Sequence, residues 1–347
     1  VYIIFAGLVC AADWIASCQE LFPFAKPDVE LDSYAQSARL RASRALEEIH
    51  WARPPQPASP LSYGDNLGFS PNEMQRAMAA ALAEMDRPGL AVIEYPMGHG
   101  KTEAAFACIH DTLRRLGGRG AYIALPTQAT ANQMFTRFRD KLAPALREDG
   151  PSELQLLHGA SILNADLLAL RPTGTPEDTE ADVVTSEWFA STKRGLLASL
   201  GVGTIDQALM GVLQVRHNFL RLFGLAGKTV VLDEVHAYDT YTSVLLEHLL
   251  RWLGSLNCTV VLLSATLPAA RRQALLDAYA GLSVPTPQPH YPSLTVVQRP
   301  EHVEVVELNG PQPKRIALDT VNRSPAAIIA ALNNRLAEGG CAACICN

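Results

Sequence analysis

The chain has 347 residues, 48% of them hydrophobic, and a formal net charge of -6 at pH 7. This length and apolar content allow a large core divided between two or three domains. The charge excludes a strong basic field over the whole surface, so any binding of nucleic acid would depend on a local groove. The seven cysteines are too few for a secreted disulfide scaffold, so we expect a reduced, cytoplasmic protein.

The first part of the chain is predicted to be helical. Residues 1–50 carry apolar positions at helical spacing, followed by Ala-, Arg- and Glu-rich sequence. The apolar run over residues 1–12 is too short to span a bilayer and has no basic leader, so we expect no membrane association. Prolines clustered between positions 54 and 60 interrupt any helix, which predicts a connector over 51–68.

Short apolar runs then alternate with helical stretches. Strands are predicted at 90–95, 121–125, 154–157, 182–185, 202–205, 229–232 and 258–263. Helices are predicted at 101–116, 129–142 and 241–253, and the second should end before Pro144. The polar stretch 171–182 is typical of a surface insertion. This alternation without hairpin signals predicts an α/β fold, with a parallel sheet and helices on both faces.

A second proline-rich stretch follows at 285–300. After it we predict a strand at 302–308, a helix at 325–338 and a strand at the C-terminus. These elements indicate the start of a second α/β lobe.

One glycine-rich segment lies where a predicted strand meets a predicted helix. Its residues are Gly98, His99, Gly100, Lys101 and Thr102. Backbone N–H groups of such a loop form an anion cradle with the helix N-terminus. Lys101 would reach the phosphates of ATP, and the Thr102 hydroxyl would ligate magnesium (Mg2+). The consensus has a glycine where this chain has Tyr95. The alternative is a glycine-rich turn with an incidental Lys-Thr pair.

An acidic pair follows the predicted strand at 229–232. Asp233 is a candidate magnesium ligand, and Glu234 is placed to orient or deprotonate the attacking water. His236 either contacts the γ-phosphate region or is an ordinary polar neighbour. A helix N-cap followed by a first-turn acid is the structural alternative for the pair.

Ser264 and Thr266 end the next predicted strand. Hydroxyl groups there can bond the side chains that follow the neighbouring strand, which offers a route from nucleotide state to domain movement. We therefore predict a coupling role for Ser264, Thr266 and His236. Ser264 lies 31 residues after Asp233 (264 − 233), which leaves room for one crossover helix.

Two further groups of polar residues are candidate ligand contacts. Gln75 has an amide suited to the adenine edge, and Phe69 is placed to stack on the ring. The alternative is a helix capped by Ser70 with a solvated Gln75.

Small hydroxyl and amide groups follow two other strands. They are Thr127, Gln128 and Thr130 after the first strand, and Thr204 and Asp206 after the second. Such groups bind phosphates without reading bases. For each segment alone, a capped or solvated surface is an equal interpretation. Their common position after strands favours a groove that tracks a nucleic-acid strand.

The ordered motifs are typical of a superfamily 2 helicase. The phrases over 96–105, 125–130, 202–207, 233–239 and 264–268 closely resemble the CRISPR-associated helicase-nuclease of type I systems. The most specific phrases are Asp-Glu-Val-His-Ala-Tyr-Asp at 233–239 and Thr-Ile-Asp-Gln at 204–207.

This resemblance implies a domain order and a fold. Residues 1–50 would be the C-terminal end of an HD nuclease domain and 51–68 a linker. The first RecA-like lobe would cover 69–283, a linker 284–300, and the start of a second RecA-like lobe 301–347. The fold would be a RecA-like P-loop sheet.

The resemblance also implies an activity. Members are ATP-dependent single-stranded DNA translocases coupled to metal-dependent DNA degradation, and a guide-RNA surveillance complex (Cascade) recruits them. Asp13 matches an HD-domain residue that helps hold a divalent transition metal. A buried, paired carboxylate is the alternative for Asp13.

The ends of the sequence bear on these expectations. The chain starts at Val1 and ends at Asn347 within a predicted strand, so we expect a piece of a longer protein. The family's arginine motif would lie beyond Asn347, so the chain alone should bind ATP but hydrolyse it poorly. Cys341 and Cys344 are interpreted as part of a buried strand and not as a zinc site. The alternative functions are a stand-alone superfamily 2 DNA or RNA helicase and a nucleotide-gated binding module.

Overall fold

The computed structural model describes residues 2–25, 28–51, 54–146, 152–161, 164–170, 183–191, 193–312, 319–337 and 339–344. The chain divides into two units, Val1–Gly310 and Pro311–Asn347. The predicted insertion at 171–182 lies outside the described residues. Among those that are described, no helix has the length and apolar character needed to cross a membrane.

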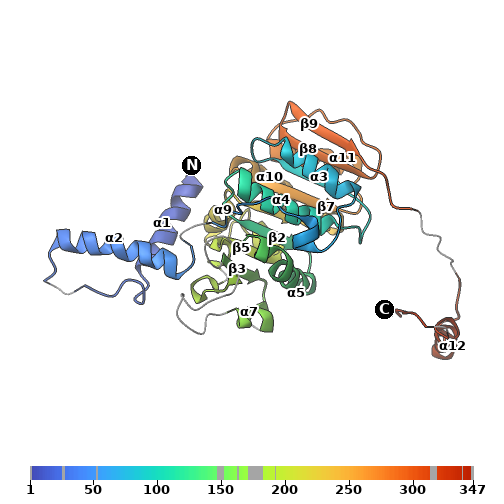
Figure 1. Cartoon of the computed structure of the whole chain (residues 1–347), viewed down its shortest axis with the longest axis horizontal. Helices are drawn as coiled ribbons and strands as arrows, with labels where there is room; N and C mark the ends of the chain where they lie inside the picture. The colour runs from blue at the N-terminus through green and yellow to red at the C-terminus, as the bar shows by residue number, and fades with distance from the viewer. Residues whose placement is uncertain are drawn as a thin grey trace. The chain divides into compact units, whose positions relative to one another are not determined.

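The described part of the first unit contains a nine-stranded sheet in the order β4-β3-β5-β2-β6-β7-β1-β8-β9 (Figure 1). The strands are β1 (Leu90–Glu94), β2 (Ala121–Leu125), β3 (Ser152–Leu157), β4 (Val183–Val184), β5 (Leu200–Thr204), β6 (Thr229–Leu232), β7 (Thr259–Ser264), β8 (Ser293–Arg299) and β9 (His302–Glu307). Strands β1 to β7 pair in parallel. The predicted α/β fold with a mainly parallel sheet is confirmed.

Helices cover both faces of this sheet (Figure 1). The helices of the unit are α1 (Tyr2–Ala16), α2 (Leu31–Glu48), α3 (Glu73–Ala83), α4 (Lys101–Arg115), α5 (Gln128–Arg137), α6 (Ala143–Leu146), α7 (Ala165–Ala169), α8 (Ile205–Leu209), α9 (Asn218–Leu225), α10 (Thr240–Ser255) and α11 (Ala269–Ala280). Helices α3, α4 and α5 share a core with Ile93 and Val231. Helices α8 to α11 share another with Val92 and Val230. Adjacent strand residues thus point to opposite cores, as the strand period requires.

The sheet extends further along the chain than the sequence predicts. β8 pairs antiparallel with β1, and β9 pairs antiparallel with β8. The structure therefore corrects two predictions, the linker at 284–300 and the assignment of 302–308 to a second lobe. Prolines next to these strands suggested a linker, but proline is compatible with the ends and edges of a sheet. The hairpin also lacks the glycine or asparagine turn that would have marked it.

The helix after β2 does not end before Pro144. Helix α5 is followed by a π-helical turn, Phe138–Leu142, and then by α6, in which Pro144 is the second residue. Proline is tolerated there because the first-turn N–H groups of a helix have no intrahelical partner.

Helices α1 and α2 join the first unit through a third core. Ala11 and Ile15 of α1 and Ala45 of α2 pack with Trp188 and Phe223. At Gly7 of α1, an added Cβ would lie 2.3 Å from Phe223 Cβ. The close contact between α1 and α9 therefore depends on a glycine.

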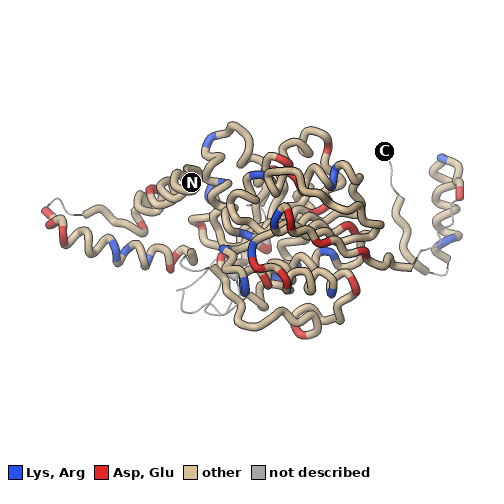
Figure 2. The backbone as a smooth tube through the Cα atoms, turned by 90° about the horizontal axis from the view of Figure 1, so that it is seen from above, with Lys and Arg blue, Asp and Glu red and all other residues tan. Residues whose placement is uncertain are grey.

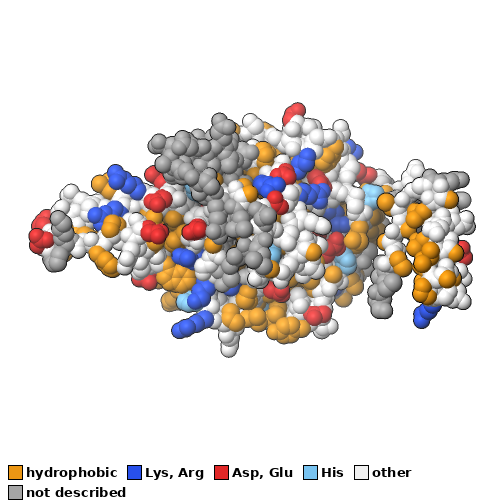
Figure 3. Space-filling model, turned by 90° about the horizontal axis from the view of Figure 1, so that it is seen from below, with side chains coloured by type: hydrophobic (Ala, Val, Ile, Leu, Met, Phe, Trp, Pro, Cys, Tyr) orange, Lys and Arg blue, Asp and Glu red, His pale blue; other side chains and the backbone are white. Residues whose placement is uncertain are grey.

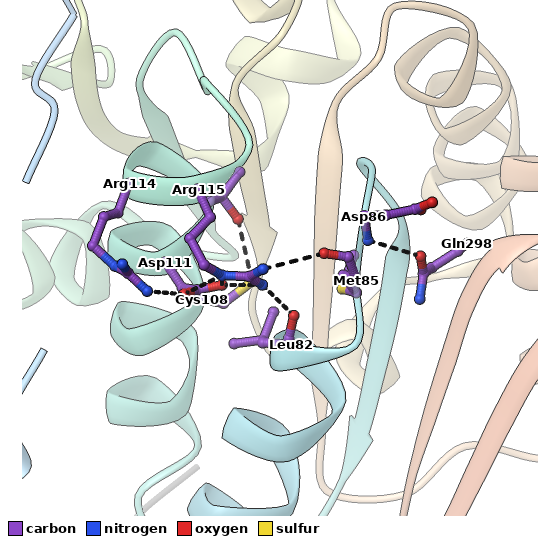
Figure 4. Close-up of polar contacts among 9 residues, drawn as sticks. Leu82, Met85, Asp86, Cys108, Asp111, Arg114, Arg115 and Gln298 are labelled. Atoms are coloured by element: carbon purple, nitrogen blue, oxygen red, sulfur yellow. Dashed lines mark hydrogen bonds and ion pairs between the residues drawn. The ribbon is translucent and has the colours of Figure 1, made fainter. Parts of the chain in front are cut away.

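An arginine holds the end of α3 and the first residues of the loop that follows it (Figure 4). Arg115, the last residue of α4, lies 2.8 Å from Asp111 one turn earlier. Its guanidinium also donates to the carbonyl oxygens of Leu82 and Met85, at the end of α3. The Leu82 carbonyl also accepts from the Met85 N–H at 2.9 Å, so the arginine adds to the hydrogen bonds that close the end of α3. They fix the loop that leads into β1.

The second unit is described around α12 (Pro325–Arg335), which Ser324 caps. Cys341 and Cys344 are exposed and lie outside any strand. The predicted buried strand is therefore wrong for the described residues 341–344. A strand needs a neighbour for its backbone groups, and the described part of this unit contains none.

Candidate active site

The glycine-rich loop joins β1 to α4. Gly98 has φ 76° and Gly100 has φ 82°, values at which glycine is favoured. Gly100 is the N-cap of α4, and it makes no side-chain cap. The first N–H groups of α4 therefore face the space above the loop, and together with the helix dipole they favour an anion.

Lys101 is held inside the loop. Its side chain is only 7% exposed. Its Nζ donates to the carbonyl oxygens of Tyr95, at 2.7 Å, and Pro96, at 3.1 Å. Burial lowers the pKa of Lys101, while the nearby charges of Glu234 and Asp233 raise it. The two carboxylates thus face the lysine across one site.

The start of α3 braces the loop. Asn72 and Gln75 form a capping box. Asn72 Nδ2 donates to the carbonyl of His99 at 2.9 Å, and Gln75 Nε2 donates to the carbonyl of Gly100 at 3.0 Å. Gln75 is 1% exposed, and its Oε1 accepts from the Asn72 N–H.

Sequence reasoning assigned Gln75 to adenine, but the structure commits its amide to the protein. Phe69 is partly exposed and lines the cavity beside the loop. Its stacking on the adenine ring stays a prediction. Asn72 was missed, although the Asn-x-x-Gln spacing of a capping box was visible in the sequence.

The acidic pair lies at the end of β6. The Asp233 N–H donates to the Ala124 carbonyl of β2. Asp233 Oδ1 accepts from the Glu234 N–H at 2.8 Å. Burial, and secondarily the Glu234 carboxylate, raise the pKa of Asp233. Such a carboxylate favours a positive charge beside it.

Glu234 has an unusual backbone and an unsatisfied side chain. Its φ is 52° and its ψ is 43°, a left-handed conformation that is uncommon for a residue other than glycine. Among the described residues its buried Oε2 accepts no hydrogen bond unless His236 Nδ1, 3.3 Å away, carries a proton. A buried carboxylate oxygen without a donor is costly. Both features at one residue are typical of a functional site.

A cavity of about 540 Å³ joins these groups. It is lined by Phe69, Ser70, Asn72, Gln75, Met97, Gly98, His99, Gly100, Lys101, Thr102, Glu103, Arg137, Asp233 and Glu234. Arg137 of α5 was missed, because nothing near it in the sequence marks a site. It forms an ion pair with Glu103, and burial lowers its pKa while Asp233 raises it.

Strand β7 lies between β1 and β6, so Ser264 at its end lies between the loop and the acidic pair. His236 Nδ1 is 3.3 Å from Ser264 Oγ, from the Ala265 N–H nitrogen and from Glu234 Oε2. When neutral, Nδ1 can accept from Ala265; when protonated, it can donate to Glu234. It cannot do both.

Ser264 and His236 thus meet as predicted, and their coupling role stays a prediction. Thr266 contributes its backbone carbonyl to this cluster, where it accepts a hydrogen bond from Ser264 Oγ at 2.9 Å. The predicted contact of the Thr266 hydroxyl is not among the hydrogen bonds that the described residues make.

The nucleic-acid candidates lie at the ends of two paired strands. Leu125 of β2 is in register with Thr204 of β5. Thr127 caps α5, where its Oγ1 accepts from the Thr130 N–H at 3.2 Å. Gln128 in the first turn of α5 and Asp206 in α8 are exposed, whereas Thr204 is buried. The structure therefore brings these loops together but withdraws Thr204 from the surface.

The positions of the charged residues agree with phosphate contacts made by a few local groups. Lys and Arg positions are interspersed with Asp and Glu positions along the tube (Figure 2). On the face shown in Figure 3, basic side chains lie among acidic and apolar ones. On this face, a phosphate contact by the described residues would come from particular groups and not from a broad basic surface.

Asp13 is exposed on α1. Within the described ranges, no three His, Cys, Asp or Glu residues lie together as a metal site would require. One carboxylate does not hold a transition metal. Asp13 therefore does not form a complete metal site with the other described residues.

The fold and the site define a P-loop nucleotide-binding protein of the helicase class. The family model for DEAD/DEAH box helicases matches residues 72–274. The chain therefore belongs to the DEAD/DEAH box helicase family, and it is similar to CRISPR-associated Cas3 proteins. The resemblance predicted from the motifs is confirmed.

Two curated relatives illustrate this similarity. The CRISPR-associated endonuclease/helicase Cas3 of Thermus thermophilus is 45% identical over 284 residues, which are 80% of this chain and 30% of that protein. The Cas3 nuclease/helicase of Streptococcus thermophilus is 36% identical over 290 residues, 81% of this chain and 31% of the relative. The chain thus spans under a third of the length of these relatives.

Two solved structures show a similarity of the same kind. The T. fusca Cas3–AMPPNP crystal structure matches with a TM-score of 0.79 and 33% identity, over 96% of this chain and 40% of that one. A chain of a CRISPR RNA-guided surveillance complex in a pre-nicking state matches with a TM-score of 0.61 and 34% identity, over 97% of this chain and 36% of that one.

Proposed function

We propose that this chain is the ATP-dependent motor of a CRISPR-associated helicase that moves on single-stranded DNA and is coupled to DNA degradation. One observation carries the proposal. Lys101, Asp233 and Glu234 line a single cavity at the carboxyl ends of parallel strands, where Glu234 has a left-handed backbone and its Oε2 lies 3.3 Å from His236 Nδ1. Ligands of α/β proteins bind at this end of a sheet.

The residues of the cavity fit ATP and Mg²⁺. The triphosphate would accept from the N–H groups of Gly100, Lys101 and Thr102, while Phe69 would face the base. Lys101 would turn from the carbonyls of the loop toward the phosphates. The Thr102 hydroxyl and Asp233 would hold Mg²⁺, which when bound neutralises phosphate charge.

Glu234 is our candidate for the residue that positions the attacking water. Its side chain lines the cavity together with Lys101 and Asp233. A carboxylate there can orient the water and take its proton. Ser264 and His236 would transmit the change in nucleotide state from the acidic pair to the neighbouring strand. Arg137 would stabilise negative charge at the phosphates.

The DNA and defence parts of the proposal rest on similarity. The relatives are named as CRISPR-associated nuclease/helicases, and one matched structure is a surveillance complex. Our candidates for contact with the DNA strand follow the carboxyl ends of two neighbouring strands, β2 and β5. They are Thr127, Gln128, Thr130 and Asp206. Asp13 is the candidate metal ligand of a nuclease site on the resemblance alone.

The test is DNA-stimulated ATP hydrolysis by the protein at its natural length. Lys101→Ala should lower the stimulated rate roughly a hundredfold, the usual cost of removing one preorganised charge-stabilising donor. Lys141→Ala, at an exposed position, is the matched control and should leave the rate unchanged. Single-stranded DNA that fails to stimulate hydrolysis, or an active Lys101→Ala protein, would reject the motor.

A further inference from the structure

Tyr95 replaces the glycine that the phosphate-loop consensus has five residues before Gly100. It follows the last residue of β1 and is 6% exposed. Glycine at this point would offer only its backbone. Tyrosine adds a ring and a hydroxyl group, and the structure uses both.

The backbone of Tyr95 lies between two motifs of the site. Its N–H donates to the Ser264 carbonyl at 3.1 Å. Its carbonyl accepts from Lys101 Nζ at 2.7 Å. The ring meets the His99 ring edge to face, with centroids 6.1 Å apart. Tyr95 therefore contacts both the phosphate loop and the strand that carries Ser264.

The side chain of Tyr95 reaches a distant part of the chain. Its hydroxyl donates to the Asn309 carbonyl at 2.9 Å. Asn309 is next to Gly310, the last residue of the first unit, and Pro311 begins the second. This hydrogen bond therefore joins the phosphate loop to the peptide that leads into the second unit.

Asn309 has a second anchor on α3. Its N–H and Nδ2 donate to Glu73 Oε1 at 3.2 and 3.0 Å. Glu73 precedes Gln75, which holds the loop at Gly100. The adjacent Leu308 N–H donates to the Pro292 carbonyl. The last residues of the first unit are thus held by hydrogen bonds to Tyr95, Glu73 and Pro292. Tyr95 and Glu73 lie on segments that also contact the phosphate loop.

We propose that Tyr95 is a positioning residue that couples the phosphate loop to residues 308–310, so that phosphate binding by Lys101 changes how firmly the end of the first unit is held. This rests on the proposed binding of ATP. Lys101 Nζ cannot move to a phosphate without lengthening its bond to the Tyr95 carbonyl. The anchor that Tyr95 offers Asn309 therefore differs between the two states.

A purely structural role would have a different signature. A buried tyrosine that only adds stability would leave the response of residues 308–310 to nucleotide unchanged. Tyr279 supplies the matched comparison, because its hydroxyl donates to the Cys258 carbonyl at 2.8 Å and it is not among the residues that line the cavity. Tyr95→Phe and Tyr279→Phe each remove one such hydrogen bond.

The experiment is hydrogen–deuterium exchange of the 347-residue chain, with and without AMPPNP and magnesium, read on peptides that cover residues 303–310. AMPPNP affinity is measured in parallel. In the wild type and Tyr279→Phe, nucleotide should change exchange at residues 308–310 by about fivefold or more, the lower end of usual coupling between sites. In Tyr95→Phe, AMPPNP should still bind, and the change should disappear.

Glu73→Ala provides an independent check, because it removes the other anchor of Asn309 and leaves Tyr95 intact. The exchange response should persist in this variant. Its loss there, an unchanged response in Tyr95→Phe, or no response in a wild type that binds AMPPNP would overturn the coupling and leave the proposed function standing. A wild type that binds no AMPPNP would overturn both.

Discussion

Gly100→Ala should lower the free energy of unfolding more than Gly98→Ala does, although both glycines have left-handed φ values. Gly100 has φ 82°, and a Cβ there would lie 2.4 Å from Gln75 Nε2. Gly98 has φ 76°, and a Cβ there would meet nothing within 4 Å. The pair therefore separates backbone strain from the loss of the brace between α3 and the loop.

The magnitudes follow from these contacts. Left-handed backbone costs an L-residue about 1–2 kcal/mol, which both variants bear. In Gly100→Ala the Gln75 amide must also leave the Gly100 carbonyl, and a buried polar group without its partner costs about 1–3 kcal/mol more. We therefore expect Gly98→Ala to lower the free energy of unfolding by about 1–2 kcal/mol, and Gly100→Ala by about 2–5 kcal/mol.

Urea unfolding at equilibrium measures this difference. It should appear as a lower midpoint at an unchanged slope. Equal destabilisation by the two substitutions would refute the brace, because only Gly100→Ala displaces Gln75.

Two further predictions concern buried or bridging charges. Burial lowers the pKa of Lys228 from 10.5 to about 7. Between these pH values the unfolded chain binds more protons, so the contribution of Lys228 to stability rises with pH, by up to about 1.4 kcal/mol per unit. Lys228→Met should remove that part of the rise from unfolding curves measured across this range; identical slopes in both proteins would contradict it. Arg115→Lys should cost about 1–2 kcal/mol of unfolding free energy, because lysine lacks the planar fork that bridges Asp111 and two carbonyls of the α3 end. An unchanged urea midpoint would show that those contacts contribute little.

The site was predictable where its chemistry is local in the sequence. A strand, a glycine-rich turn and a helix place Lys101 and Thr102 within one short segment, and a strand followed by Asp233 and Glu234 does the same for the acids. The meeting of Ser264 with His236 also followed from strand order. All these residues lie at the carboxyl ends of parallel strands, so one inference about topology places them together.

Other parts depended on contacts between distant segments. Arg137 enters the cavity from a helix whose sequence marks no site. Gln75 has an amide suited to an adenine contact, but in the structure this amide is hydrogen-bonded to the backbone of Asn72 and Gly100. The hairpin of β8 and β9 contains no turn signal, and prolines around it favoured a linker. In the sequence Tyr95 is only a departure from a consensus, because its partner Asn309 lies 214 residues further on.

The central claim is that the cavity beside Lys101 binds ATP with Mg²⁺. The most direct test is the affinity of the 347-residue chain for ATP and magnesium, measured by titration calorimetry on the wild type, Lys101→Met and Glu234→Gln. We expect binding by the wild type, its loss in Lys101→Met and its retention in Glu234→Gln, since Glu234 acts on water and not on the phosphates. Undiminished binding by Lys101→Met, or none by the wild type, would contradict the assignment of this cavity.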